Sequence, residues 1–93
     1  MITFLLNEEI FRLCPFDDWL TDGETLTGEP TVTVTNASGE PQPTMVSDVA
    51  LYGLTGVRYK IKALAVGFYT VRIDAVTSNG QKPAYRYPME VKA

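Results

Sequence analysis

An all-β sandwich of two antiparallel sheets is the fold that this sequence predicts, and three observations support it. Short segments in which apolar and polar residues alternate recur along the chain, as in strands with one buried face. Turn-forming residues separate these segments at intervals of roughly 8 to 12 residues. One segment opens with Gly67-Phe68-Tyr69, a pattern typical of a strand entered through a sharp corner. No segment is long enough to form a helix that would support a mixed fold.

The segment Gly67–Val76 is the most informative in the chain. Tyr69 stands near its start, and Val71, Ile73 and Ala75 follow on the same face. In immunoglobulin-like sandwiches, a Tyr near the start of the sixth strand donates its hydroxyl to upstream backbone, forming a tyrosine corner. We therefore expect an immunoglobulin-like sandwich in which Tyr69 forms this corner. Val71 occupies the position at which antibody domains carry the second Cys of their cross-sheet disulfide.

The other elements are predicted from the same patterns. The predicted strands are Ile2–Leu6, Ile10–Cys14, Thr31–Thr35, Val46–Tyr52, Val57–Ala63, Gly67–Val76 and Tyr85–Val91. Asp17–Leu20 is predicted to form one helical or 3₁₀ turn capped by one of its Asp residues. Gly39–Pro43 is predicted to be an extended, exposed connection. Because Pro88 lacks an N–H, the last strand should lie at a sheet edge, or Pro88 should face away from its neighbour.

Length and charge limit the organisation and the partners. A chain of 93 residues forms one domain, 1–93, which buries roughly two-thirds of its unfolded surface. The net charge of −3 disfavours a nucleic-acid partner, because binding phosphates requires a concentrated positive surface. The basic row Arg58, Lys60 and Lys62 is the exception. We interpret it as the solvated face of a strand, with contact to a polyanion or a partner protein as the alternative.

The N-terminal segment and the single cysteine indicate the compartment of synthesis. Ile2–Leu6 is apolar but lacks the cationic start and the length of a signal peptide, and no run reaches transmembrane length. Cys14 is the only cysteine, so an internal disulfide is excluded. We expect a protein that is made in a cytoplasm and has no membrane partner.

Few residues offer catalytic chemistry. The chain has no His, so a lone Cys14 has no partner for a thiol dyad, and we expect it to be a small buried residue. The only group with metal-like chemistry is the acidic cluster Asp17, Asp18, Asp22 and Glu24, whose spacing does not match an EF-hand loop. We interpret the cluster as a cap and a polar turn, and we consider paired-carboxylate hydrolysis less favoured, because a sandwich of this size rarely provides a substrate cleft. The expected assignment is no catalytic residue, no metal, no cofactor and no enzymatic activity.

Aromatic residues are the other place where a binding site could lie. Trp19 falls outside every predicted strand, and we expect its ring to close the end of the core, whereas an exposed ring would suggest a ligand platform. Phe68 alternates with Tyr69, so it should face outward or contact another chain. Tyr85 and Tyr87 share one face of the last strand. A sheet edge that carries such residues is a plausible partner surface.

Three motifs are similar to those of a known family. Asp18–Leu26 (Asp-Trp-Leu-Thr-Asp-Gly-Glu-Thr-Leu), Gly67–Val71 and Thr77–Gln81 (Thr-Ser-Asn-Gly-Gln) occur in this order. Together they resemble the small immunoglobulin-like proteins encoded among the structural genes of tailed bacteriophages. The chain departs from that pattern at Glu24, where the family usually has Asp, in having one residue between Gly67 and Tyr69, and in its apolar N-terminal piece.

The resemblance implies a non-enzymatic virion component of the head, neck or tail, made in the bacterial host cytoplasm. Its implied partners are copies of itself or other virion proteins, repeated by symmetry. The expected contacts are Ile2–Leu6 or the outer faces of the last strands.

A carbohydrate- or cell-surface-binding module of fibronectin type III kind is the alternative. The approach Leu64–Tyr69 also resembles the corresponding segment of those modules. Their early strand Trp is not matched, because Trp19 precedes the strand Thr31–Thr35. A small hydrolase is a third and more distant alternative.

Overall fold

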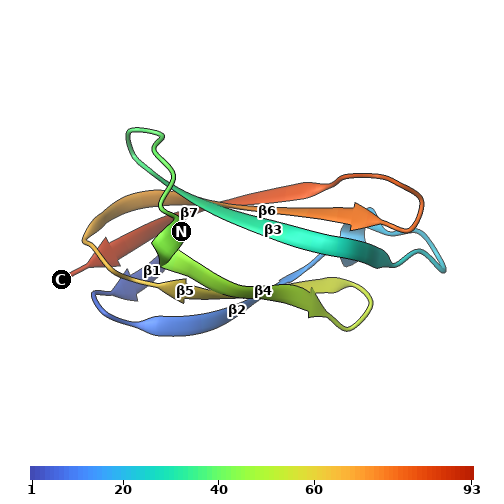
Figure 1. Cartoon of the computed structure of the whole chain (residues 1–93), viewed down its shortest axis with the longest axis horizontal. Coiled ribbons are helices and arrows are strands. Elements are labelled where there is room, and N and C mark those ends of the chain that lie inside the picture. The colour runs from blue at the N-terminus through green and yellow to red at the C-terminus, as the bar shows by residue number, and fades with distance from the viewer.

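The computed structural model describes all 93 residues and contains seven strands in two layers (Figure 1). The strands are β1 (Ile2–Leu5), β2 (Glu9–Pro15), β3 (Leu26–Asn36), β4 (Val46–Tyr52), β5 (Gly56–Lys62), β6 (Gly67–Thr77) and β7 (Ala84–Lys92). Two 3₁₀ turns, η1 (Asp17–Trp19) and η2 (Pro43–Met45), are the helical segments. Neither has the length and apolar character needed to cross a membrane.

The strands form one sheet in the order β1-β7-β6-β3 and a second in the order β2-β5-β4. Every neighbouring pair is antiparallel except β1 and β7, which run parallel. The two sheets face each other along the length of a molecule with extents of 44 × 23 × 20 Å (Figure 1). The predicted immunoglobulin-like β-sandwich is confirmed.

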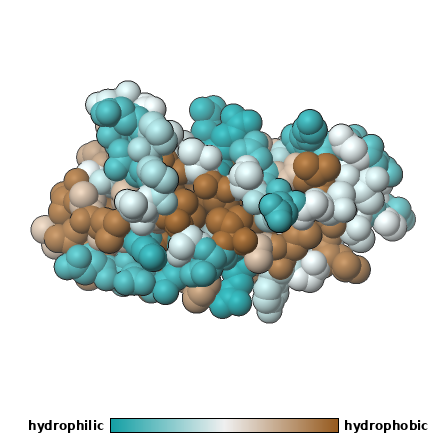
Figure 2. All heavy atoms as spheres, viewed as in Figure 1, coloured by the Kyte–Doolittle hydropathy of each residue, from teal (hydrophilic) through white to brown (hydrophobic).

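The core lies between the sheets and follows the predicted alternation. The inward residues of β5, β6 and the chain just after β5 are buried: Val57, Tyr59, Ile61, Ala63, Tyr69, Val71, Ile73 and Ala75. Met89 and Val91 of β7 and Phe4 of β1 are buried with them. Figure 2 shows hydrophobic side chains in a band between the two layers, with hydrophilic side chains above and below. The period-2 pattern therefore identified the buried faces of β5, β6 and β7 correctly.

The tyrosine corner forms as predicted. The Tyr69 hydroxyl donates a hydrogen bond of 2.8 Å to the carbonyl oxygen of Ala65. Gly67, at the first position of β6, has a φ of +152°, a conformation that residues with a side chain rarely adopt. The chain uses this glycine and this hydroxyl to leave the β5 sheet and enter the β6 sheet.

The strand β3 is longer than predicted. It begins at Leu26 instead of Thr31, and its pairing with β6 is interrupted between Thr27 and Thr31 by a change of register. The interruption contains Gly28, with a φ of +71°, and Pro30. Gly and Pro normally end a strand. The first five residues of β3 were therefore not predicted, because the strand continues through Gly28 and Pro30 as a bulge.

The strand β7 is a sheet edge along half of its length. β1 pairs with Met89–Lys92, whereas Ala84–Pro88 has only β6 beside it. Pro88 is thus the last residue of the open edge, which agrees with the first of the two predicted alternatives. The segment Ile2–Leu6 contains the predicted strand, β1, which pairs with β7 in the domain's own sheet. Its residue Phe4 is buried in the core, so this segment cannot be removed without damage to the fold.

Candidate functional site

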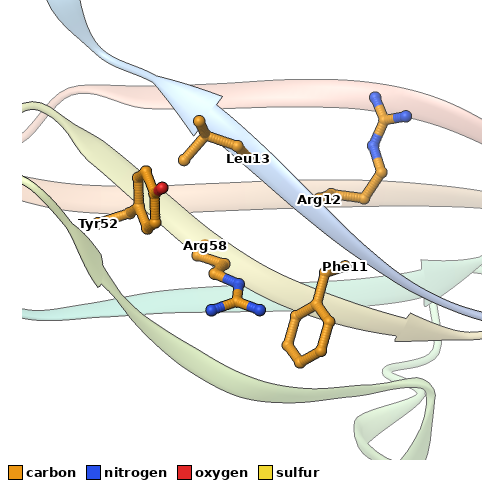
Figure 3. Close-up of a pocket in the computed structure, with 5 residues that line it drawn as sticks. All are labelled: Phe11, Arg12, Leu13, Tyr52 and Arg58. Atoms are coloured by element: carbon orange, nitrogen blue, oxygen red, sulfur yellow. The ribbon is translucent and has the colours of Figure 1, made fainter.

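The outer face of the β2-β5-β4 sheet carries large apolar side chains that face solvent. Phe11 and Leu13 project from β2 and Tyr52 from β4, and all three are about half exposed. Arg58 of β5 lies between them (Figure 3). We call these four residues the outer patch. Aromatic side chains and Arg are the residues most enriched in protein interfaces.

The outer patch borders a shallow hollow of about 370 Å³. Arg12 also borders it, but Phe11 and Arg12 leave β2 in opposite directions, and the Arg12 guanidinium points away from the patch (Figure 3). The cation that the hollow presents is therefore Arg58. Its surroundings can hold an apolar group beside an anionic one.

Local packing explains why Leu13 lies against the hollow. Gly56 of β5 is buried beneath it, and a Cβ atom there would stand 3.0 Å from Leu13 Cδ1 and 3.1 Å from the carbonyl oxygen of Tyr52. Leu13 therefore rests on space that only a glycine leaves free. Without a side chain at Gly56, both Leu13 of β2 and the Tyr52 backbone of β4 can pack closely against β5 at this end of the patch.

The charges of the face are unevenly paired. The Arg58 guanidinium carbon lies 4.0 Å from the centroid of the Phe11 ring, and the Lys60 ammonium lies 5.5 Å from it. Lys60 also forms a 3.2 Å ion pair with Glu9. The other carboxylate of the three strands, Asp48, accepts a 3.1 Å hydrogen bond from the Ser47 hydroxyl. Arg58 thus has an aromatic neighbour and no carboxylate partner.

Four polar side chains, Arg12, Cys14, Tyr59 and Tyr87, lie on the inner side of β2. The Cys14 sulfur lies 3.6 Å from the Tyr87 hydroxyl of the opposite sheet, and Cys14 is buried as predicted. Burial raises the pKa of the Cys14 thiol, which makes it a poor nucleophile. Burial also raises the pKa of Tyr59, against the effect of the nearby Arg12 guanidinium, and it raises the pKa of Tyr87 strongly. The Nε of Arg12 is buried without a hydrogen-bond partner.

The prediction that Trp19 closes the core is wrong. Its side chain is 49% exposed, and its ring forms a T-shaped pair with the Tyr85 ring at a centroid distance of 6.3 Å. Phe16 occupies the buried position instead, with no exposed surface and a 4.9 Å edge contact to the same Tyr85 ring. Two aromatic residues stand close together in the sequence, and the one before the turn is the one that turns inward. Trp19 and the neighbouring Gln81 and Lys82 border a hollow of about 410 Å³.

The acidic cluster does not converge on one point. The structure contains no group of three or more His, Cys, Asp or Glu residues that could hold a metal ion. Asp17 and Asp18 lie in η1, whose N-cap is Phe16, so the predicted Asp cap is wrong because no side chain caps this short turn. Glu24 is the one buried residue of the cluster. Its Oε1 accepts a 3.1 Å hydrogen bond from the Thr21 N–H, while its buried Oε2 has no partner.

The outer face of the other sheet is polar except at its end. Phe68 is 56% exposed, as predicted from its alternation with Tyr69. Farther along the face, Arg72 forms an ion pair of 3.0 Å with Asp74 on the same strand. Arg86 lies opposite Arg72 in the register, beside a hollow of about 430 Å³ that is bordered only by polar residues.

The basic row is partly as expected. Arg58 is exposed, whereas Lys60 and Lys62 are half-buried. Phe11, Leu13 and Tyr52 were not predicted as site residues. The signal that could have found Phe11 and Leu13 is in β2 itself, where these two residues on one face alternate with buried Cys14 on the other, so that both faces carry apolar residues.

Comparison with known proteins shows the class of fold. No protein-family model and no curated protein matches the chain. Among solved structures, CopC from Methylosinus trichosporium OB3b aligns with a TM-score of 0.66 and 14% identity over 99% of this chain and 85% of CopC. Murine CRIg aligns with a TM-score of 0.51 and 14% identity over 98% of this chain and 89% of that structure. The chain is therefore an immunoglobulin-like β-sandwich domain, and at this identity the likeness extends to the fold alone.

Proposed function

We propose that the protein is a non-enzymatic structural subunit of a tailed-bacteriophage virion, an accessory or decorating component of the head, neck or tail. Its partners are copies of itself or other virion proteins. The order of the motifs around Trp19, Tyr69 and Asn79 supports the phage assignment by resemblance. The structural support comes from the surface.

The observation that carries the proposal is the number of large apolar side chains left exposed on a small domain. Phe11, Leu13, Tyr52, Trp19 and Phe68 are each between 46% and 56% exposed. They lie on both outer faces and at η1, rather than on one strand. Exposed apolar patches rimmed by polar residues mark surfaces that another protein covers. A subunit surrounded by neighbours requires several such surfaces.

The test measures incorporation into particles. A tagged wild-type chain is expressed during infection, and purified virions are assayed for it. Phe68→Asp should lower incorporation, because the charge would have to be buried under a neighbouring protein. Ser38→Asp, which adds the same charge in the exposed turn after β3, is the matched control and should incorporate normally. Wild-type protein that is made during infection yet missing from purified virions would refute the proposal.

A carbohydrate- or cell-surface-binding module is the second candidate, and the exposure of Trp19 favours it. An exposed ring beside the amide of Gln81 and the ammonium of Lys82 combines an apolar platform with polar groups. Ligand sites commonly pair apolar surface with a few such polar groups. A glycan array tests this candidate. Binding that Trp19→Ala abolishes and Phe68→Asp leaves unchanged would support it over the virion role.

A further inference from the structure

We propose that the outer patch of one copy receives the Asp17–Trp19 turn of a second copy of this chain. The inference rests on the proposed function and deepens it, because it names the partner and the two surfaces that meet. Two complementary surfaces on one chain carry it.

The outer patch requires an occupant that is both apolar and anionic. Phe11, Leu13 and Tyr52 border the hollow with about half of their surface exposed. Arg58 stands among them without a carboxylate partner, and Lys60 adds a second cation near the Phe11 ring. An aliphatic or aromatic side chain can cover the rings, while an adjacent carboxylate pairs with the guanidinium.

The Asp17–Trp19 turn supplies both groups within three residues. Trp19 forms a T-shaped pair with Tyr85 yet is half exposed, so part of its ring is free to contact another surface. Asp17 and Asp18 precede it, and neither forms an ion pair within its own chain. The turn is therefore an aromatic residue flanked by unpaired carboxylates, which matches an aromatic hollow that contains an unpaired guanidinium.

Overall charge favours a second copy as the occupant. The chain has a net charge of −3 although the three cations Arg58, Lys60 and Lys62 lie on this face, and the three strands hold two carboxylates, Glu9 and Asp48. The remaining surface of each copy is consequently acidic. A basic patch on an acidic molecule attracts another copy in an orientation that brings the patch to the acidic turn.

Self-association reports the contact directly because Trp19 is the only tryptophan. Sedimentation velocity and native fluorescence are measured over a wide range of protein concentration at low and high salt. We expect the average mass to rise with concentration and the Trp19 emission to shift to shorter wavelength with it. Association should weaken at high salt, since the contact pairs charges.

Charge reversal identifies the two surfaces. Arg58→Glu should weaken self-association at least about tenfold, and Asp17→Lys with Asp18→Lys should do the same. All three substitutions in one chain make the outer patch acidic and the turn basic, so the two surfaces are again complementary. This chain should associate to within about threefold of wild type. Arg86→Glu, which changes an Arg on the outer face of the other sheet, is the matched control and should have no effect. Melting temperatures verify that each variant is folded.

Three results would overturn the proposal: a wild-type chain that stays monomeric, association that survives Arg58→Glu, or a charge-exchanged chain that fails to associate. Binding of another virion protein at Arg58 by a monomeric chain would also overturn it, because the occupant would then be that protein. The particle assay is separate. A chain that incorporates into virions without self-association through this patch refutes this inference and leaves the proposed function standing. A chain that self-associates through this patch but is absent from virions refutes the proposed function and leaves the self-contact standing.

Discussion

The Tyr69 hydroxyl is held by the carbonyl oxygen of Ala65, four residues upstream and 2.8 Å away. This bond closes the connection between β5 of one sheet and β6 of the other. The hydroxyl is fixed from both sides, since the ring of Tyr69 is buried in the core while Gly67 packs close to its end. One hydrogen bond, made by one hydroxyl group, thus stabilises the connection between the sheets.

Removal of that atom should destabilise the domain without changing its fold. Tyr69→Phe keeps the ring and loses the hydrogen bond, so the free energy of unfolding should fall by about 1 to 3 kcal/mol. Urea denaturation measures the change. Tyr52→Phe is the matched control, because Tyr52 is exposed and its hydroxyl has no hydrogen-bond partner in the protein. Equal midpoints for the two variants would show that the corner bond contributes nothing.

Phe16 and Trp19 should differ sharply in their contribution to stability. Both contact the Tyr85 ring, but Phe16 is fully buried and Trp19 is half exposed. Phe16→Ala should cost about 3 to 5 kcal/mol, because it opens a cavity in the core. Trp19→Ala should cost only about 1 kcal/mol, the value of an aromatic contact at the surface.

Native Trp19 fluorescence provides an independent measurement of the same difference. At protein concentrations low enough to keep the chain monomeric, the emission should be red-shifted and readily quenched by acrylamide. Blue-shifted emission that resists the quencher under those conditions would contradict the exposure of Trp19.

Calcium should not stabilise the protein. The carboxylates of Asp17, Asp18, Asp22 and Glu24 do not converge on one point, so millimolar calcium should leave the melting temperature unchanged. A cation that binds only the folded state would have to raise it. Asp17→Asn with Asp18→Asn serves as the control, because a calcium-dependent rise that this variant loses would place a site in the turn.

Alkaline pH should destabilise the domain through its inner tyrosines. Burial raises the pKa values of Tyr59, Tyr85 and Tyr87 in the folded state above the ordinary tyrosine value of about 10. A raised folded-state pKa contributes stability that is fully present below the unfolded pKa and is lost as the pH rises through the folded pKa. The urea midpoint should therefore hold up to about pH 10 and fall above it.

Tyr87→Phe isolates the largest of these effects. Its urea midpoint should fall less steeply above about pH 10 than that of the wild type, whatever its value at neutral pH. Absorbance of the tyrosinate form should show late ionisation in the native protein and normal ionisation in urea. A midpoint that rises with pH in this range would contradict the assigned direction.

The fold could be predicted largely from the sequence, because strand alternation and the tyrosine corner are local signals. Val71 and Ile73 are buried where the period of two places them, and Tyr69 bonds upstream as expected. The length of β3 could not be predicted in the same way, since Gly28 and Pro30 indicate a strand end and the chain passes through them in a bulge. In this segment, pairing with β6 outweighs the low strand propensity of Gly28 and Pro30.

The candidate site as a whole could not be predicted from local patterns: the pattern of β2 could indicate Phe11 and Leu13, but the site is assembled across three strands. Phe11 and Arg58 are far apart in the sequence, and only the register of β2 with β5 brings the ring beneath the guanidinium. The prediction that Trp19 closes the core was wrong for a related reason. A turn offers no periodicity, so the choice between Phe16 and Trp19 as the core residue is made by tertiary packing alone.

The half-open edge of β7 has a consequence for the proposed role as a subunit surrounded by neighbouring copies. An open edge invites backbone pairing, which can extend a sheet from molecule to molecule without limit. Here the open stretch is short and ends at Pro88, which offers no N–H, and Trp19 packs against Tyr85 within it. Runaway polymerisation through β7 is thereby restricted. At β7, contacts between copies are therefore left to side chains, whose chemistry can discriminate between correct and incorrect neighbours.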